Sequence, residues 1–254
     1  MTAEPGDIYF HTYGQGPVKM VGLHGWSGSH RTYAKVGALL PSDVGLLAMD
    51  LPGYKRSPDP PSWALNDIAA QIAAQLRREL PGRFTLVGNC SGCLLTLKVA
   101  PMLTDRIDRL ILVEPFAYLP WYFGIFLTPV FGRLFYWSAF GNGLGRWLTD
   151  RNLKNQRTKD SNLAATFKRT RMRTTLNYLR RYADMGEAAD FADIGCPVSL
   201  IYADKTFASV KESVQIWHEV WPSSEVVELH GAGHLMLQEI PQDATTALLS
   251  QLGR

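Results

Sequence analysis

The chain is predicted to adopt an α/β fold, a mostly parallel sheet interrupted by a helical insertion, and three observations lead to this prediction. Short apolar runs that end in a turn alternate with stretches of helical periodicity. The alternation breaks off once, between residues 116 and 187, and then resumes. The composition of the 254 residues, 46% hydrophobic and 19% charged, is that of a globular protein, so disordered, collagen-like and coiled-coil chains are excluded.

The predicted strands are apolar runs, as expected for strands that are buried on both faces of a parallel sheet. In chain order they span residues 17–25, 44–49, 84–88, 110–113, 198–202 and 225–229. The first predicted helix spans residues 67–80, where Ile68, Ile72 and Leu76 recur at helical spacing. Further helices are expected after Cys90 and over residues 244–252.

The insertion begins with an aromatic run that is almost uncharged. From 116 to 140 only Arg133 is charged, and eleven of the chain's 28 aromatic residues lie there. Pro120 and Pro129 make the run a poor transmembrane helix, so we expect two short apolar helices, or a helix and a loop. Because the flanking segments form one continuous pattern, we predict a core of residues 1–115 and 188–254, with a cap of residues 116–187.

The second half of the cap is basic. Eleven Lys and Arg residues lie between 146 and 181 against Asp150 and Asp160, a balance of +9 in a chain whose net charge is +3. Such a run is either a solvated helix face or a surface for an anionic partner such as coenzyme A, an acyl carrier protein or a membrane touched by the cap. No nucleic-acid motif accompanies the charge, so nucleic acid is not expected as a partner.

Cysteine usage and the N-terminal residues favour a reducing compartment. Three cysteines, an odd number, argue against a secreted disulfide framework. Residues 1–7 lack the basic and apolar regions of a signal peptide. A cytoplasmic protein is therefore expected.

The most informative local pattern is Gly88-Asn89-Cys90-Ser91-Gly92, which lies between a predicted strand and a predicted helix. In a G-x-nucleophile-x-G turn the central residue has a strained backbone and projects from the sheet, and the small flanking residues let strand and helix approach each other. The helix N-terminus behind Cys90 also favours a thiolate. Cys90 is therefore the predicted nucleophile.

Two further segments supply partners for Cys90 in the expected chain order. His24-Gly25-Trp26 ends the first predicted strand, where a backbone N–H could join that of Ser91 to hold an oxyanion. The segment 231–234, Gly-Ala-Gly-His, follows the last predicted strand and supplies a loop histidine, His234. An acid between Cys90 and His234 would complete the order nucleophile, acid, histidine.

These segments together resemble the α/β-hydrolase superfamily, with residues 116–187 as the variable cap of that family. The matching residues are LHGW (23–26), DLPGYKRS (50–57), VGNCSG (87–92), VSLIYAD (198–204) and GAGH (231–234). The resemblance implies a mostly parallel sheet of about eight strands with helices on both faces. It also implies Cys90 as nucleophile, His234 as base, and the N–H groups of Trp26 and Ser91 as the oxyanion hole.

The nucleophile departs from the usual family pattern, which has serine at position 90. Cysteine at this position resembles dienelactone hydrolases, polyhydroxyalkanoate synthases and some thioesterase domains. A thiolate paired with an imidazole suits acyl transfer from thioesters and activated esters.

The acid is a second departure. The family pattern after the strand at 198–202 is G-x-x-D, whereas this chain has Ala203-Asp204-Lys205-Thr206, with Thr206 at the usual acid position. Asp204 comes two residues early, roughly 6–7 Å away in an extended loop. Glu114, after the strand at 110–113, is the alternative, as in haloalkane dehalogenases of the superfamily. Both acids stay open, as does a site without an acid.

The sequence therefore predicts a cysteine-dependent acyl hydrolase, a thioesterase or esterase, that forms an acyl-Cys90 intermediate. Its pocket for a hydrophobic acyl group is expected to include His24, Trp121, Phe123, Phe126 and Trp137. Two alternatives stay open: an acyltransferase, cyclising or condensing enzyme that uses the same intermediate, and a hydrolase-fold ligand binder without turnover. The chain has neither metal-ligand spacing nor a phosphate-binding loop, so no metal and no cofactor are expected.

Overall fold

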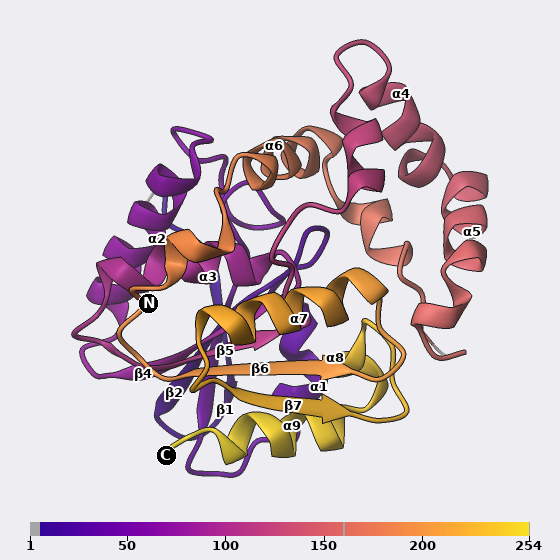
Figure 1. The fold of residues 1–254 in the computed structure, drawn as a ribbon. Coiled ribbons are helices and arrows are strands. Elements are labelled where there is room, and N and C mark those ends of the chain that lie inside the picture. The colour runs from indigo at the N-terminus through magenta and orange to yellow at the C-terminus, as the bar shows by residue number, and fades with distance from the viewer. Residues whose placement is uncertain (1–5, 160, 254) are drawn as a thin grey trace.

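The structure, a computed structural model, describes residues 6–159 and 161–253. Residues 1–5, part of the N-terminal stretch in which no signal peptide is expected, lie outside the described residues, and so does Asp160 of the basic run. Within the described part of the chain, a twisted central sheet has helices on both faces, and a helical segment projects from one end (Figure 1).

Seven strands form one sheet over the described residues, in the order β1-β3-β2-β4-β5-β6-β7. The strands are β1 (Phe10–Gly14), β2 (Val18–Leu23), β3 (Gly45–Met49), β4 (Phe84–Asn89), β5 (Ile107–Val113), β6 (Val198–Ala203) and β7 (Glu225–Leu229). All neighbouring strands are parallel except β1, which pairs antiparallel with β3. The mostly parallel sheet is confirmed, with seven strands instead of about eight.

The sequence does not predict β1. It lies at the edge of the sheet, with Phe10 opposite Met49 and Gly14 opposite Gly45. Its residues, Phe-His-Thr-Tyr-Gly, are half-buried or exposed and contain no apolar run. An edge strand that has one free side does not need the apolar sequence of a central parallel strand.

The helices fill the connections between strands. The α-helices are α1 (Ala34–Gly37), α2 (Leu65–Glu79), α3 (Gly92–Val99), α4 (Gly132–Tyr136), α5 (Gly143–Asn152), α6 (Met172–Ala183), α7 (Ala208–Val220), α8 (Met236–Glu239) and α9 (Pro241–Ser250). The 3-10 helices are η1 (His30–Tyr33), η2 (Ala100–Met102), η3 (Trp121–Leu127), η5 (Lys154–Gln156), η6 (Ala165–Arg169) and η7 (Ala188–Phe191), and η4 (Trp137–Gly141) is a π-helix.

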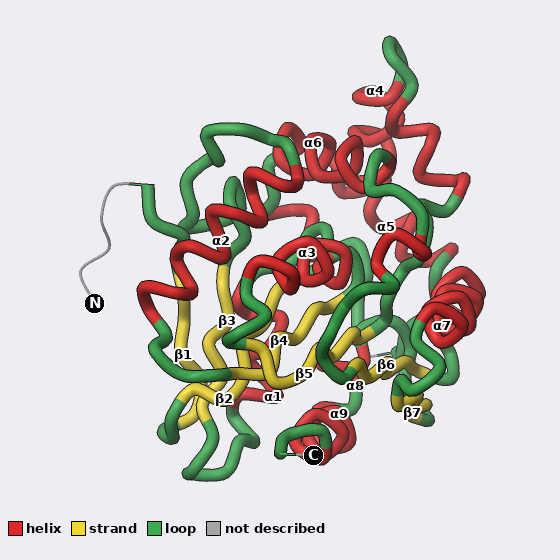
Figure 2. Tube along the Cα trace, turned by 60° about the vertical axis from the view of Figure 1, so that its left-hand side comes forward, coloured by secondary structure: helices red, strands yellow, loops and turns green. Residues whose placement is uncertain are grey.

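The sheet separates two cores because successive side chains of a strand point to opposite faces. Along β4, Leu86 belongs to the core under α2, α3 and α7, whereas Val87 belongs to the core under α1, α8 and α9. Leu110 and Ile111 divide in the same way along β5. Figure 2 shows these two helical layers on either side of the strands.

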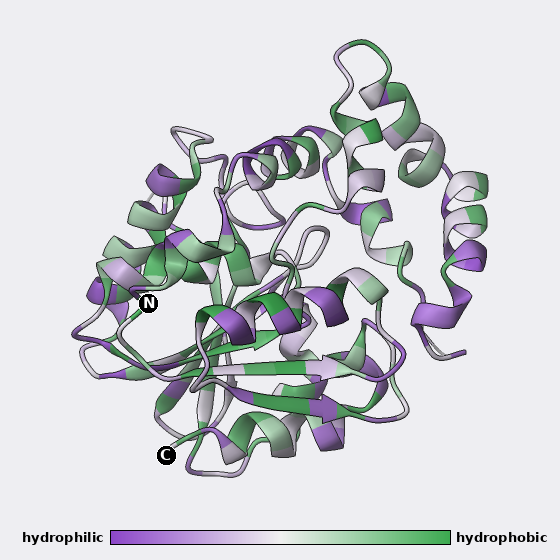
Figure 3. Cartoon of the chain, in the orientation of Figure 1, coloured by the Kyte–Doolittle hydropathy of each residue, from purple (hydrophilic) through white to green (hydrophobic). Residues whose placement is uncertain are grey.

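The segment 116–187, here called the cap segment, connects β5 to β6 through helices alone in its described residues. Its inner side has a small core of its own, formed by Phe126, Tyr136, Phe140, Leu176 and Leu179 around Trp26 of the β2 loop. Apolar residues also colour the outer helices near α4 (Figure 3). No helix among the described residues is long and apolar enough to cross a membrane. The division into a core and a cap domain stays a prediction.

Candidate active site

The predicted catalytic side chains lie at one edge of the sheet, where the parallel strands end. Cys90 directly follows β4, Glu114 directly follows the neighbouring β5, and His234 lies in the loop between β7 and α8. The carboxyl ends of the strands are the edge at which open parallel sheets form their ligand sites.

Cys90 sits in a strained turn between β4 and α3. Its φ is 55°, a left-handed conformation that residues with a side chain rarely adopt. The turn is tight because Gly92 packs against the β2 loop, where a Cβ would lie 2.5 Å from the carbonyl oxygen of His24. The Cys90 amide donates to the carbonyl of Val113 at 2.8 Å, which fixes the turn to β5. This is the local geometry that the G-x-nucleophile-x-G pattern predicts.

Three side chains from three loops form a continuous chain of contacts. The Sγ of Cys90 lies 3.2 Å from Nε2 of His234, and Nδ1 of His234 lies 2.7 Å from Oε2 of Glu114. Glu114 is fully buried and His234 is 9% exposed, so water does not screen the ion pair between them. The arrangement is that of a nucleophile, a base and an orienting acid.

The position of Glu114 separates the two acids that the sequence left open. Its Oε1 accepts from the Ala203 amide at 2.7 Å, and its Oε2 accepts from the hydroxyl of Thr206, the residue at the family's usual acid position. Asp204 instead accepts from the Gly231 amide at 2.9 Å and holds the loop. The structure brings Glu114 to His234 and leaves Asp204 away from the Nδ1 contact.

The charge on His234 follows from these neighbours. Burial lowers the pKa of His234, but the Cys90 sulfur and the Glu114 carboxylate outweigh burial and raise this pKa to about 10. The imidazolium of His234 therefore faces the Cys90 sulfur at 3.2 Å.

Two turns bring their backbones close to Cys90. Gly25 packs directly on Cys90, since a Cβ at position 25 would lie 2.9 Å from the Cβ of Cys90. The next amide is that of Trp26, and the amide of Ser91 follows Cys90 at the start of α3. No backbone carbonyl in the described residues accepts from either amide. Within the described part of the chain, both N–H groups therefore have no backbone acceptor.

His24 has a different place from the one predicted. It is fully buried, its Nε2 accepts from the Leu51 amide at 3.0 Å, and its Nδ1 donates to the Gly25 carbonyl at 2.7 Å. Burial lowers its pKa to about 4, so the ring is neutral and joins the β2 loop to the β3 loop. The prediction that His24 lines the pocket is wrong, because His24 is not among the residues that line the cavity at Cys90.

A small apolar cavity of about 50 Å³ opens at Cys90 and Ser91. Its other walls come from the β2 loop, α3, the start of the cap segment and α6, with the residues Trp26, Leu94, Phe116, Tyr118, Leu119, Pro120, Phe123, Leu179 and Tyr182. Of the predicted pocket aromatics, Phe123 lines this cavity. Phe126 is buried behind it, where its ring centroid lies 6.3 Å from that of Trp26.

Trp121 and Trp137 are the clear errors among the predicted pocket residues. The side chain of Trp121 is 88% exposed and that of Trp137 is 51% exposed, and neither lines the cavity. An aromatic run with almost no charge gives no sign of which residues face outward, and here these two do.

Sequence reasoning missed several residues that complete the site. Thr206 was treated only as a missing acid, whereas its hydroxyl contacts Glu114 and lies 3.3 Å from Nδ1 of His234. Leu179 and Tyr182 of α6 line the cavity. Their spacing of three residues along a helix places them on one face, and this spacing is the signal in the sequence that could identify them.

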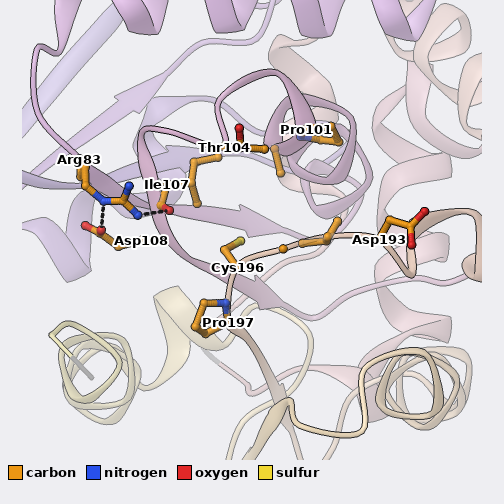
Figure 4. A pocket seen from close by; sticks show the side chains of 11 residues that line it. Arg83, Pro101, Thr104, Ile107, Asp108, Asp193, Cys196 and Pro197 are labelled. Carbon is orange, nitrogen blue, oxygen red and sulfur yellow. Dashed lines mark hydrogen bonds and ion pairs between the residues drawn. The ribbon is translucent and has the colours of Figure 1, made fainter.

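A larger cavity, about 220 Å³, lies at the opposite ends of the strands, next to Ile107 at the start of β5 and Pro197 before β6. Arg83 spans its rim, where it pairs with Asp108 (Figure 4). None of the catalytic candidates lines it, so its size does not make it the active site. Among the described residues no three His, Cys, Asp or Glu side chains are grouped to hold a metal ion.

Comparison with curated proteins gives partial matches. Over 106 residues the chain is 33% identical to a pimeloyl-[acyl-carrier protein] methyl ester esterase of Pectobacterium carotovorum subsp. carotovorum, covering 42% of this chain and 40% of that relative. Over 110 residues it is 27% identical to lipase LipV of Mycobacterium tuberculosis, covering 43% and 42%. The matched region spans less than half the length of these relatives.

Two further comparisons, with solved structures and with a family model, match nearly the whole chain. A thermophilic esterase from Thermogutta terrifontis superposes with a TM-score of 0.77 at 19% identity, over 99% of this chain and 95% of the esterase, which is a likeness of fold. A model of the alpha/beta hydrolase family matches residues 20–248. The protein therefore belongs to the alpha/beta hydrolase family.

Proposed function

We propose that the protein is a cysteine-dependent acyl hydrolase that cleaves esters or thioesters of a hydrophobic acyl group. The observation that carries this proposal is the chain of contacts from the Sγ of Cys90 through His234 to Glu114, with distances of 3.2 and 2.7 Å. Threonine at the family's usual acid position would favour a ligand binder without turnover if His234 had no acid partner. Because the Glu114 carboxylate contacts His234, this argument for a ligand binder no longer holds.

The chemistry runs in two halves. The Cys90 thiolate attacks the acyl carbonyl, and the amides of Trp26 and Ser91 donate to the oxyanion. His234 then gives its proton to the departing alkoxide or thiolate, which leaves an acyl-Cys90 thioester. In the second half His234 takes a proton from water as the water attacks this thioester, and collapse of the second oxyanion releases the acid and Cys90.

The cavity limits the acyl group. Its walls are almost wholly apolar, which favours an uncharged hydrocarbon chain next to the carbonyl. A volume of about 50 Å³ is the space of roughly one or two water molecules. An acyl chain of more than a few carbons would therefore extend beyond this cavity.

The carrier of the acyl group is proposed to be anionic. One face of α6 lines the cavity through Leu179 and Tyr182, and its other face exposes Arg173 and Arg180, for which the described residues provide no ion-pair partner. The Pectobacterium relative acts, by its name, on an ester of an acyl carrier protein. Together these observations support coenzyme A or an acyl carrier protein as the carrier.

Mass spectrometry of the intact protein tests the proposal. After brief exposure to acyl thioesters, the wild type should gain the mass of one acyl group, and Cys90→Ala should gain none. Cys93→Ala serves as the control, because Cys93 is fully buried, donates to the Val113 carbonyl and does not line the cavity. Full hydrolysis by Cys90→Ala would overturn the proposal.

Acyl transfer is the second candidate, and the thiol nucleophile is the observation that favours it. A thioester intermediate reacts more readily with amines and thiols than an oxygen ester does. Product analysis with and without an added amine separates the two functions: a hydrolase releases the free acid in both, and a transferase releases the amide.

A further inference from the structure

The outer side of the cap segment is unusually apolar. Fourteen large hydrophobic side chains are exposed among the described residues, and eleven of them lie between Trp121 and Leu148. The most exposed are Trp121 at 88%, Val130 at 78% and Leu144 at 67%. We call these eleven residues the apolar cap face. A concentration of this kind on one part of a soluble surface marks an interaction site.

The apolar cap face lies on the part of the molecule that projects furthest from the sheet. In both views α4 stands beyond the core, at the top of the molecule (Figure 1, Figure 2). The helix η3 belongs to this face and to the active site at once, because Trp121 is exposed and Phe123 lines the cavity at Cys90. A partner that covers the face therefore lies next to the cavity.

Residues 121–148, which span the apolar cap face, carry only positive charges. No acidic residue occurs between Glu114 and Asp150, and Asp150 is buried and pairs with Arg157 at 2.5 Å. Arg133 is exposed within the face, and the guanidinium of Arg151 lies 5.3 Å from the ring centroid of Trp147. The described residues provide no carboxylate partner within salt-bridge distance for Arg133 or Arg151.

A second copy of the chain fits this surface poorly. A two-fold interface would bring each face against its equal, so the arginines of both copies would meet without acidic partners. The interfacial region of an anionic bilayer supplies what the face lacks: negative charge for the arginines and a medium that tryptophan side chains prefer.

We propose that the apolar cap face docks on the surface of an anionic lipid bilayer. The exposed side chains of η3, α4 and α5 enter the headgroup region, and Arg133 and Arg151 contact lipid phosphates. Docking would place the cavity at Cys90 close to the lipid. The proposal does not depend on acyl hydrolase activity, because it rests on exposed residues outside the catalytic contacts.

Vesicle flotation tests the proposal with the full chain. The wild type should float with vesicles of phosphatidylcholine that contain about 30% phosphatidylglycerol, and much less with phosphatidylcholine alone. Trp121→Gln/Leu144→Gln should lower the partition coefficient at least about tenfold, because two large apolar contacts with lipid are lost. Quenching of wild-type tryptophan fluorescence by brominated lipid should report the same contact without any substitution.

The matched control is Leu39→Gln/Val226→Gln, which removes two exposed apolar side chains outside the cap segment and should leave the partition unchanged. Equal thermal melting of both double variants establishes that they are folded. Three results would overturn the proposal: no flotation with either vesicle, equal flotation of both double variants, or a dimer in solution that Trp121→Gln/Leu144→Gln abolishes.

Discussion

At the scale of single residues, the site depends on where a carboxylate can reach Nδ1 of His234. The ends of β5 and β6 are neighbours in the sheet, so an acid after either strand starts from nearly the same place. Here Glu114 directly follows β5 with a φ of 55°, and the Thr206 hydroxyl after β6 donates to its carboxylate. The Thr206 hydroxyl, at the family's usual acid position, thus holds the carboxylate that we propose as the acid.

Substitution of the two acids should have unequal effects on catalysis. Glu114→Gln removes the charge that faces His234, and we expect kcat/KM to fall by about 10²-fold, at the lower end for a general base because a thiol needs little help to ionise. Asp204→Asn should leave kcat/KM close to wild type, because the Asp204 side chain contacts Gly231 and His230 of the β7–α8 loop and does not contact His234 itself. Steady-state hydrolysis of a small activated ester measures both. A larger loss in Asp204→Asn than in Glu114→Gln would assign the role to Asp204.

The titration of His234 should depend on the sulfur that faces it. With a pKa of about 10, the wild-type imidazole keeps its proton as the pH rises from neutral into the alkaline range. Cys90→Ala removes the largest influence that raises this pKa, while burial continues to lower it, so His234 should lose its proton at a lower pH. Nitrogen NMR of the imidazole ring gives the midpoints. His11, whose pKa is lowered mainly by burial, serves as the internal reference and should not move; equal His234 midpoints in both proteins would contradict the assignment.

At the scale of elements, α6 has two faces with different tasks. Its buried side supplies Leu176 and Leu179 to the core around Trp26, and its exposed side carries Arg173 and Arg180. A cationic surface beside a cavity attracts an anionic carrier and raises the rate of encounter.

Charge reversal on α6 should therefore discriminate between substrates. Arg173→Glu/Arg180→Glu should raise KM for a substrate on coenzyme A or an acyl carrier protein about tenfold at low salt, with kcat and the hydrolysis of an uncharged ester unchanged. Lys19→Glu is the control, because Lys19 lies at the start of β2, at the end of the sheet opposite Cys90. If Arg173→Glu/Arg180→Glu and Lys19→Glu had the same KM for the anionic substrate, this face of α6 would contact only solvent and would not bind the carrier.

Elements differ in how far the sequence predicts them. The predicted ranges match the six parallel strands to within three residues at each end. For the central strands β3 to β6 this is because both faces are mostly buried, which requires a nearly continuous apolar run, whereas the edge strand β7 is only partly buried. The largest error is the start of β5, where Asp108 and Arg109 interrupt the run. Arg109 is nevertheless buried, and its guanidinium donates to the hydroxyl of Ser199 on the neighbouring strand β6 at 2.9 Å. This hydrogen bond offsets the cost of burying the charge, and the sequence of β5 alone gives no sign of it.

The site shows the same limit. Cys90 and His234 stand in local motifs whose spacing follows from one turn each, so the sequence alone indicates them as candidates. To identify the acid, one must know where the side chains at the ends of the adjacent strands β5 and β6 point. No local sequence pattern contains this information. Between residues 116 and 140 there is almost no charge, so the sequence does not distinguish outward-facing side chains such as Trp121 from inward-facing ones such as Phe123.

At the scale of the whole molecule, Trp26 joins the sheet to the cap segment. Its indole N–H donates to the carbonyl of Thr175 in α6 at 2.8 Å. Its ring lies edge-on to Phe123, Phe140 and Phe167, with centroids 5.1 to 5.7 Å away. A residue that carries a proposed oxyanion amide in its backbone thus anchors the cap segment with its side chain.

Removal of this anchor should destabilise the cap segment and the site together. We expect Trp26→Ala to lower the free energy of unfolding by about 3–5 kcal/mol, the range for a large aromatic side chain taken from a packed core. Urea unfolding followed by circular dichroism measures the change, and kcat/KM should fall as well because the cavity loses a wall. Trp121→Ala removes the same side chain from an exposed position and should change the free energy by no more than about 0.5 kcal/mol. Equal changes in the free energy of unfolding for Trp26→Ala and Trp121→Ala would contradict this prediction. The Trp26 side chain would then not be what holds the cap segment on the core.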